Sequence, residues 1–289
     1  RYAAAVNEPK LAEGAWSLAL LTPTLPPATR TTTLVLGGDR LLIVEPATPH
    51  PEEQARLAAL IASLAAEGRE VVAILLTHHH VDHIGHAQEL RTRLDVPILA
   101  HPATAARLRF AVDETIEEGW SIDLGAGHRA EALHTPGHAP GHLMIWERAS
   151  NVAHVGDMVA GEGTILVDPS DDGDMGLYLD SLRRMQSLAE RSLAERGRAP
   201  IFVPAHGPVL PDSIGVTRHY IAHRLAREAK VRRAILEQGA RSFSEVVRLT
   251  YADTPAAPYP LAAMSVEAHL RKLVREGEVV REGAELRPA

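Results

Sequence analysis

The chain has 289 residues, a length that suits one large domain or one domain with a small appendage. Hydrophobic residues make up 45% and charged residues 23%, ordinary globular values that exclude a disordered or fibrous chain. The formal net charge is −7, but residues 1–217 carry 17 Lys and Arg against 28 Asp and Glu (−11), whereas residues 218–289 carry 13 against 9 (+4). This asymmetry indicates two parts with different surroundings.

The sequence contains no cysteine, which excludes disulfides, thiolate catalysis and sulfur-ligated metal sites. Histidine is abundant at 16 residues, so any metal ion would be held by nitrogen and oxygen. Apolar stretches such as Val71–Leu76 are far shorter than the ~20 residues needed to cross a bilayer. No signal-peptide pattern opens the chain, so we expect a cytoplasmic protein without membrane contact.

In residues 1–215, short strands alternate with helices. Strands are predicted at 16–21, 31–36, 41–45, 71–76, 96–100, 143–146, 151–155 and 201–203. Helices are predicted from 51 to before Gly68, at about 86–93, from 102 and at about 176–195. This order predicts an α/β domain in which two sheets form a sandwich with helices outside.

Residues 216–289 form a second, mostly helical part. Helices are predicted at 217–237 and 244–251, and a third is expected to be capped by Ser265 and ended by Gly277. The final segment, 278–287, has the pattern of a small hairpin. Three helices followed by a hairpin predict a small winged-helix-like domain.

Four potential metal ligands follow the strand at 71–76 within six residues: His78, His80, Asp82 and His83. In extended backbone, residues i and i+2 project to the same side, so His78 and His80 can converge on one ion. Asp82 and His83 lie where the chain turns into the next helix and can face a second ion. A polar loop with chance histidines is the alternative, but one strand end seldom needs four such side chains.

Three further candidates lie in turns at strand ends, namely His138, Asp157 and His206. Taken singly, each is more often an ordinary turn residue than a ligand. Together with the first four they make five histidines and two aspartates, which is enough to hold two divalent ions. A nitrogen and oxygen donor set suits zinc, with manganese or iron as alternatives.

These motifs resemble the metallo-β-lactamase-fold hydrolase superfamily, through His-x-His-x-Asp-His at 78–83, Thr-Pro-Gly-His at 135–138, Gly-Asp at 156–157 and His206. The resemblance covers about residues 15–212 and implies an αββα four-layer sandwich. Segments 161–164, 220–228 and 269–273 are most similar to the glyoxalase-II-like branch, specifically to lactamase-beta-like proteins with a C-terminal winged helix.

The resemblance implies that His78, His80 and His138 hold one Zn²⁺, that Asp82, His83 and His206 hold the other, and that Asp157 bridges both. A metal-bridging hydroxide would then be the nucleophile, with Asp82 as the catalytic residue that holds the attacking water. His142 and His79 are near enough in sequence to suspect as proton donors. For His142 we favour a strand-start residue that is hydrogen-bonded to its own loop.

The sequence departs from the family pattern on two early strands. The family usually has Thr-Asn-x-Tyr and Asp-x-Gly where this chain has 31–34, Thr-Thr-Thr-Leu, and 45–47, Glu-Pro-Ala. Glu45 is expected to orient a ligand histidine. Because these strands build the substrate-facing edge, the family's specificity is not carried over, and no substrate-binding residue is assigned.

Three functions remain open. Hydrolysis of a small-molecule acyl ester or thioester is favoured, because a net charge of −11 would repel a polyanion. Cleavage of single-stranded RNA is the first alternative, since a mitochondrial member of the similar branch is an endoribonuclease and the C-terminal part is basic. The second is a metal-containing nucleic-acid-binding regulator without hydrolase activity. Arg271, Lys272 and Arg275 would contact RNA, although Glu267 and Glu276 favour a solvated face beside a packing or dimer surface.

Overall fold

The computed structural model describes residues 10–254 and 259–289, which form two compact units. The first unit consists of the described residues up to Thr135 together with 141–164 and 189–213. The second consists of 136–140, 165–188 and the described residues from Ile214 onward. The two units therefore interleave along the chain, and a domain boundary at residue 215 stays a prediction.

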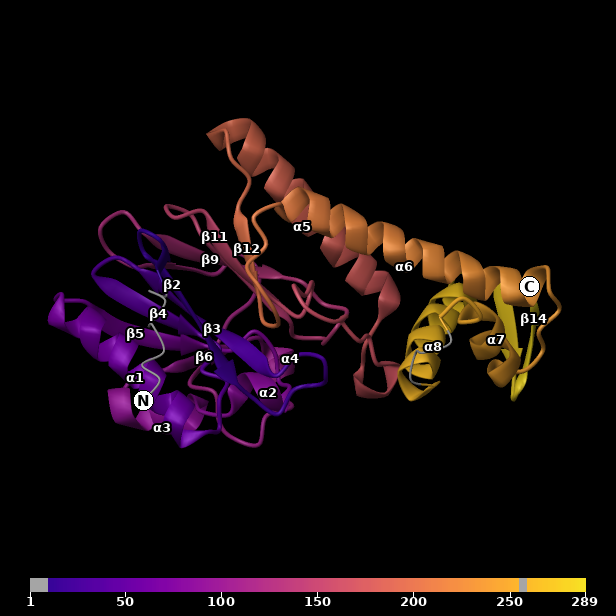
Figure 1. Ribbon diagram of the computed structural model, residues 1–289, viewed down its shortest axis with the longest axis horizontal. Coiled ribbons are helices and arrows are strands. Elements are labelled where there is room, and N and C mark those ends of the chain that lie inside the picture. The colour runs from indigo at the N-terminus through magenta and orange to yellow at the C-terminus, as the bar shows by residue number, and fades with distance from the viewer. Residues whose placement is uncertain (1–9, 255–258) are drawn as a thin grey trace, which may run out of the picture. The chain divides into compact units, whose positions relative to one another are not determined.

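The first unit contains a seven-stranded sheet whose strands lie in chain order (Figure 1). They are β1 (Lys10–Ala12), β2 (Ala15–Leu21), β3 (Arg30–Gly37), β4 (Arg40–Val44), β5 (Glu70–Leu75), β6 (Ile98–Ala100) and β7 (Glu114–Thr115). Strands β1 to β4 are antiparallel neighbours, whereas β4 to β7 are parallel. Parallel neighbours need crossovers, and these contain α1 (Pro51–Ala66), α2 (Val81–Ile84), α3 (Ala87–Leu94) and α4 (Pro102–Ala105).

A second sheet of five strands has the order β12-β11-β10-β9-β8. Its strands are β8 (Ser121–Asp123), β9 (Arg129–His134), β10 (Leu143–Glu147), β11 (Val152–Gly156) and β12 (Ile201–Pro204). Only β11 and β12 are parallel, and α5 (Met175–Arg196) lies between them in the chain. The last turns of α5 contact this sheet through Ser192, whose hydroxyl donates to Asn151 Oδ1 at 3.3 Å.

Alternation along the strands explains the layers. On β3, Leu34 and Leu36 belong to a buried cluster that also contains Ile145 of β10, so this face packs between the two sheets. Val35 points the other way, into a cluster with Leu57 of α1. Figure 1 shows α1 and α3 on that outer side. The predicted αββα sandwich is confirmed.

The second unit contains α6 (Ser213–Leu236), α7 (Phe243–Thr250), α8 (Tyr259–Arg275) and a hairpin of β13 (Val279–Glu282) and β14 (Glu285–Pro288). These elements share one core cluster of apolar side chains, including Val231, Val247, Leu270 and Leu286. Ser242 begins α7 with a capping box that involves Glu245. Three helices and a hairpin are present, as the sequence predicted.

The start of α8 differs from the prediction. The helix is already formed at Tyr259, so Ser265 is a buried residue inside it rather than its cap. Pro260 explains the difference, because a proline often indicates a loop in a sequence but is also tolerated in the first turn of a helix. In the described ranges, no helix has the length and apolar character needed to span a membrane.

Candidate metal centre

Strand ends bring the predicted ligands together. His78 follows β5, while Asp157 and His206 follow β11 and β12, which run in parallel. His138 follows β9, which is antiparallel to β10, as β11 is, so β9 and β11 also run in the same direction. The carboxyl ends of β9, β11 and β12 therefore lie at the same end of the second sheet.

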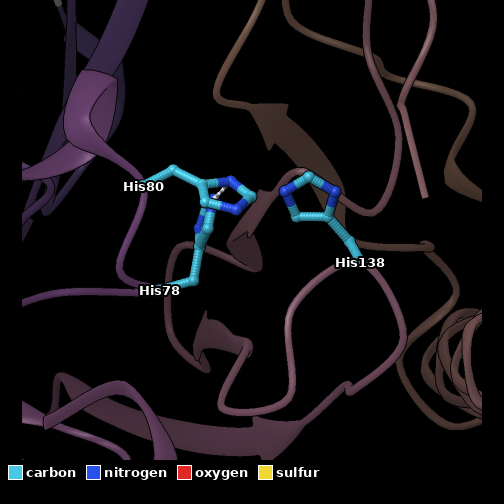
Figure 2. Close-up of side chains that lie close together, drawn as sticks. All are labelled: His78, His80 and His138. Carbon is cyan, nitrogen blue, oxygen red and sulfur yellow. Dashed lines mark hydrogen bonds between the residues drawn. The ribbon is translucent and has the colours of Figure 1, made fainter. Parts of the chain in front are cut away.

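A first group consists of His78, His80 and His138, each of which offers one ring nitrogen that lies within 4.8 Å of the other two (Figure 2). His78 Nε2 lies 3.0 Å from His80 Nδ1. His138 Nδ1 lies 2.7 Å from the carbonyl oxygen of Leu166, to which it must donate, so its Nε2 keeps the lone pair that a metal requires.

A second group consists of Asp82, His83 and His206, again with ligand atoms within 4.8 Å of one another. His206 Nδ1 donates to the carbonyl oxygen of Arg30 at 3.0 Å, which leaves Nε2 for a ligand. His206 Nε2 lies 3.5 Å from Asp82 Oδ2 and 3.4 Å from Asp157 Oδ1. Thr24, which the sequence analysis missed, has its hydroxyl 3.5 Å from the same nitrogen.

His83 tests whether these residues fit a cation. Its Nε2 is buried, makes no hydrogen bond to any residue the structure describes, and lies 3.6 Å from Asp82 Oδ1 and 3.8 Å from Asp157 Oδ1. Burial alone would lower the pKa of His83, but the carboxylates of Glu45, Asp157 and Asp82 raise it to about 10. These three carboxylates make the surroundings of His83 negative and would stabilise a positive charge there. The residues therefore fit a divalent cation.

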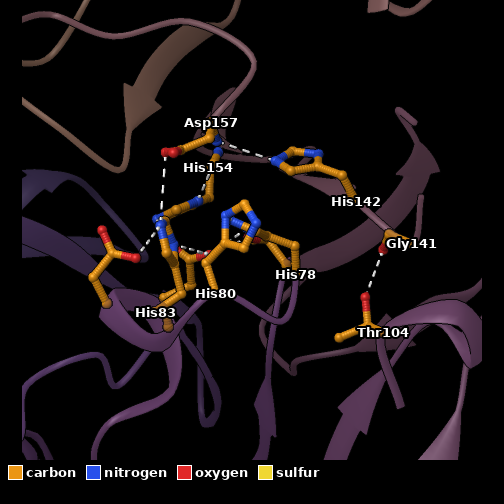
Figure 3. A network of polar contacts seen from close by, with 12 residues as sticks. His78, His80, His83, Thr104, Gly141, His142, His154 and Asp157 are labelled. Atoms are coloured by element: carbon orange, nitrogen blue, oxygen red, sulfur yellow. Dashed lines mark hydrogen bonds and ion pairs between the residues drawn. The ribbon is translucent and has the colours of Figure 1, made fainter. Parts of the chain in front are cut away.

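The two groups adjoin each other. The ring centroids of His78 and His83 are 4.0 Å apart, and Figure 3 shows both histidines in one polar network with Asp157. Asp157 lies beside His83 and His206 of the second group, with its Oδ1 3.8 Å and 3.4 Å from their Nε2 atoms. Its bridging of both groups stays a prediction.

Glu45 lies behind the second group, as expected for a residue that orients a ligand. Its Oε1 is 2.9 Å from His83 Nδ1 and also accepts the hydroxyl proton of Thr77. Its Oε2 is 3.4 Å from Nε2 of His154. Burial would raise the pKa of Glu45, but His83, His154 and Thr77 together lower it to about 2, so the carboxylate is ionised.

Two buried histidines support the site without joining either group. His142 Nδ1 is 2.8 Å from the hydroxyl of Thr135, and its Nε2 accepts the backbone N–H of Asp157 at 3.1 Å. Because both nitrogens are engaged, His142 holds Asp157 in place and is not suited to proton donation. His154, which the sequence analysis missed, donates to Thr32 and accepts from Gly156. Its position three residues before Asp157 on a buried strand was the only signal.

A family model described as "Metallo-beta-lactamase superfamily" matches residues 25–193, more than half of the sequence. The chain belongs to this superfamily. A second model, "Beta-lactamase associated winged helix domain", matches residues 242–286. Both parts of the resemblance seen in the sequence are thereby confirmed.

Several proteins with assigned names are similar to this chain in sequence. A beta-lactamase-like protein 2 homolog of Caenorhabditis elegans is 27% identical over 86% of this chain and 80% of its own length. A hydroxyacylglutathione hydrolase of Rhodospirillum rubrum is 32% identical over 46% of this chain and half of its own. An atrochrysone carboxyl ACP thioesterase of Aspergillus fumigatus is 28% identical over 87% of this chain and 77% of its own length.

Solved structures show the same fold. A beta-lactamase domain protein from Burkholderia ambifaria has a TM-score of 0.79 at 22% identity and covers 97% of this chain and 93% of its own. The metallo-beta-lactamase family protein TTHA1429 from Thermus thermophilus has a TM-score of 0.73 at 21% identity, covering 97% and 100%.

Proposed function

We propose that the protein is a hydrolase of acyl esters or thioesters that depends on two divalent cations, preferentially Zn²⁺. The observation that carries this proposal is the pair of adjoining donor groups, one with His78, His80 and His138, the other with Asp82, His83 and His206. We assign these six residues as ligands and Asp157 as the bridge. The set offers nitrogen and oxygen but no sulfur, which suits zinc, with manganese or iron as alternatives.

Bound cations would acidify water and offset the negative charge that develops on the attacked carbonyl group. The protein's own residues do the positioning. Asp82 is the side chain we expect to hold the attacking water, because its carboxylate lies on the first turn of α2 beside both His83 and His206. The water's oxygen forms a bond to the acyl carbon, the bond from that carbon to sulfur or oxygen breaks, and the leaving group takes a proton.

The substrate class is supported by two relatives. The name of one specifies an acylated glutathione and that of the other a thioesterase acting on an acyl carrier protein. The negative charge of residues 1–217 agrees with a neutral acyl group rather than a polyanion at the site. We further propose that the protein acts in the cytoplasm.

The test is to reconstitute the protein with Zn²⁺ and to compare a chromogenic acyl thioester, an aryl phosphodiester and labelled single-stranded RNA. We expect two zinc equivalents and turnover of the thioester. Preferred RNA cleavage would favour the endoribonuclease, and no turnover by the metal-loaded protein would favour the regulator.

His80→Ala and Asp157→Ala should each lower zinc affinity by more than about 100-fold. Mutation of a residue that only supports a ligand already lowers metal affinity by about 10–100-fold, and loss of a ligand itself should cost more. Activity should fall with zinc affinity. The matched control is His219→Ala, which removes an exposed histidine of α6 outside both groups. Retained turnover in either ligand variant would overturn the assignment.

A further inference from the structure

The three cations of α8 have partners inside the second unit. Arg271 Nη1 donates to the carbonyl oxygen of Pro169 at 2.8 Å. The two terminal nitrogens of Arg275 donate hydrogen bonds to the two carboxylate oxygens of Asp174. Lys272 contacts Glu228 at 2.8 Å. Arg271 and Arg275 thus bind the segment 165–174, although more than half of each side chain stays exposed.

Helix α6 holds the other end of this segment. Arg224 is only 5% exposed, and its guanidinium donates to the carbonyl oxygen of Ile165. The same guanidinium lies 5.3 Å from the ring centre of Tyr178 on α5. A buried guanidinium bound to a backbone carbonyl fixes that backbone strongly, because leaving such a charge without its acceptor would be costly.

The segment 165–174 in turn holds the loop that carries His138. The carbonyl oxygen of Leu166 accepts the Nδ1 proton of His138, and the backbone N–H of Asp174 donates to Gly137 at 2.8 Å. A Cβ on Gly137 would lie 2.2 Å from the backbone nitrogen of Tyr178, so the loop packs tightly against the start of α5. The position of His138 therefore depends on where this segment lies.

We propose that the winged helix positions His138, with Arg224, Arg271 and Arg275 as the positioning residues that act through the segment 165–174. Pro136 and Pro140 restrict the backbone of the loop at 136–140, and Gly137 has a φ of +131°. The imidazole of His138 can still rotate about its own side-chain bonds unless a hydrogen bond holds it. The carbonyl of Leu166 sets both the ring direction and the tautomer. The consequence for metal binding rests on the proposed role of His138 as a ligand.

The test reads the histidine ring directly in metal-free protein labelled with ¹⁵N-histidine, at a pH above the ordinary histidine pKa. Two-bond proton–nitrogen spectra report the tautomer, and His138→Gln identifies the His138 signals. In Arg275→Gln we expect these signals to shift toward a tautomer mixture, while those of His206, held by Arg30 in the first unit, stay unchanged. Unchanged His138 signals in Arg275→Gln would overturn the proposal.

Arg232→Gln is the control, because Arg232 donates to Glu278 at 2.6 Å in the same unit and makes no hydrogen bond or ion pair with the described segment 165–174. If Arg275→Gln also disturbs His269 in the core of the winged helix, the swapped pair Asp174→Arg with Arg275→Asp decides. Recovery of both signals supports the proposal, whereas recovery of His269 without His138 contradicts it.

Zinc titration separates this inference from the proposed function. We expect Arg275→Gln to weaken one of two zinc equivalents by about 10–100-fold, the range for residues that orient a ligand. If His138→Gln leaves zinc binding intact, the ligand assignment fails even where the tautomer shift is seen. If His138→Gln loses zinc and Arg275→Gln leaves the tautomer unchanged, only the positioning role fails.

Discussion

Glu45 shows how one carboxylate can organise several histidines. It has a φ of +56°, a left-handed conformation that is uncommon for a residue other than glycine and costs about 1–2 kcal/mol. The conformation places its carboxylate between His83 and His154, with the hydroxyl of Thr77 as a further partner. The strain is therefore retained where it orients a candidate ligand.

Glu45→Gln should weaken zinc binding at the group of Asp82, His83 and His206 by about 10–100-fold. Glutamine keeps the shape of the side chain but removes the charge that faces His83. Competition with a chromogenic chelator measures the affinity. Glu147→Gln is the control, since Glu147 is also buried but accepts the backbone N–H groups of Ala149 and Ser150. Glu147→Gln should lower the free energy of unfolding without changing zinc affinity. Equal zinc affinities in the two variants would contradict the role of Glu45.

At the scale of elements, Asp113 ties α3 to the parallel edge of the first sheet. Its carboxylate accepts the Nε proton of Arg91 on α3 at 2.7 Å and the backbone N–H of Ile98 on β6 at 2.9 Å. The hydrogen bond with Arg91 is the main cause that lowers the pKa of Asp113 from 3.8 to about 2. Because the folded protein favours the ionised form, Asp113 adds stability above pH 3.8 and loses it as the pH falls through about 2.

Asp113→Asn should lower the free energy of unfolding at neutral pH by about 1 kcal/mol, a modest value because the Arg91 side chain is 45% exposed. The difference from the unaltered protein should shrink as the pH falls from 3.8 toward 2. Urea unfolding at a series of pH values measures it. Glu70→Gln, which alters an exposed carboxylate at the start of β5, should show no such trend. A difference for Asp113→Asn that does not change with pH would refute the ion pair's contribution.

For the whole molecule, the charge asymmetry of the sequence has a structural use other than RNA binding. The basic C-terminal part places Arg271, Lys272 and Arg275 against partners of the second unit. Lys272 is 13% exposed, and Arg271 and Arg275 keep about half of their side chains exposed, so a phosphate would compete with these partners for the same donors. The surface left to RNA is thus poorer in available cations than the sequence suggests.

Labelled single-stranded RNA should bind the zinc-loaded protein no more tightly than about 10⁻⁶ M at physiological salt, the nonspecific range. Fluorescence anisotropy at several salt concentrations measures both the affinity and its salt dependence. A tighter complex that weakens steeply with added salt would show that released cations do contact the phosphates. An RNA site would then have to be considered beside the proposed thioester site.

Much of the candidate site was readable from the sequence because its pattern is local. His78, His80, Asp82 and His83 are close in the chain, and a strand followed by a turn is enough to direct them to one side. The later candidates, His138, Asp157 and His206, were recognisable because each lies in a turn at a strand end. The order of strands and helices likewise predicted the sandwich, since each strand's burial pattern follows its own residues.

Only the tertiary structure decided what depends on distant partners. His142 became a support for Asp157 through a hydrogen bond, and His154 joined the network of Glu45 through an ion-pair contact; no spacing along the chain encodes either. The cations of α8 are the clearest case, because a lysine or arginine in a helix has the same sequence pattern whether it faces RNA or an acidic loop. Which partner it meets is determined when segments about 100 residues apart, such as those of Asp174 and Arg275, pack together.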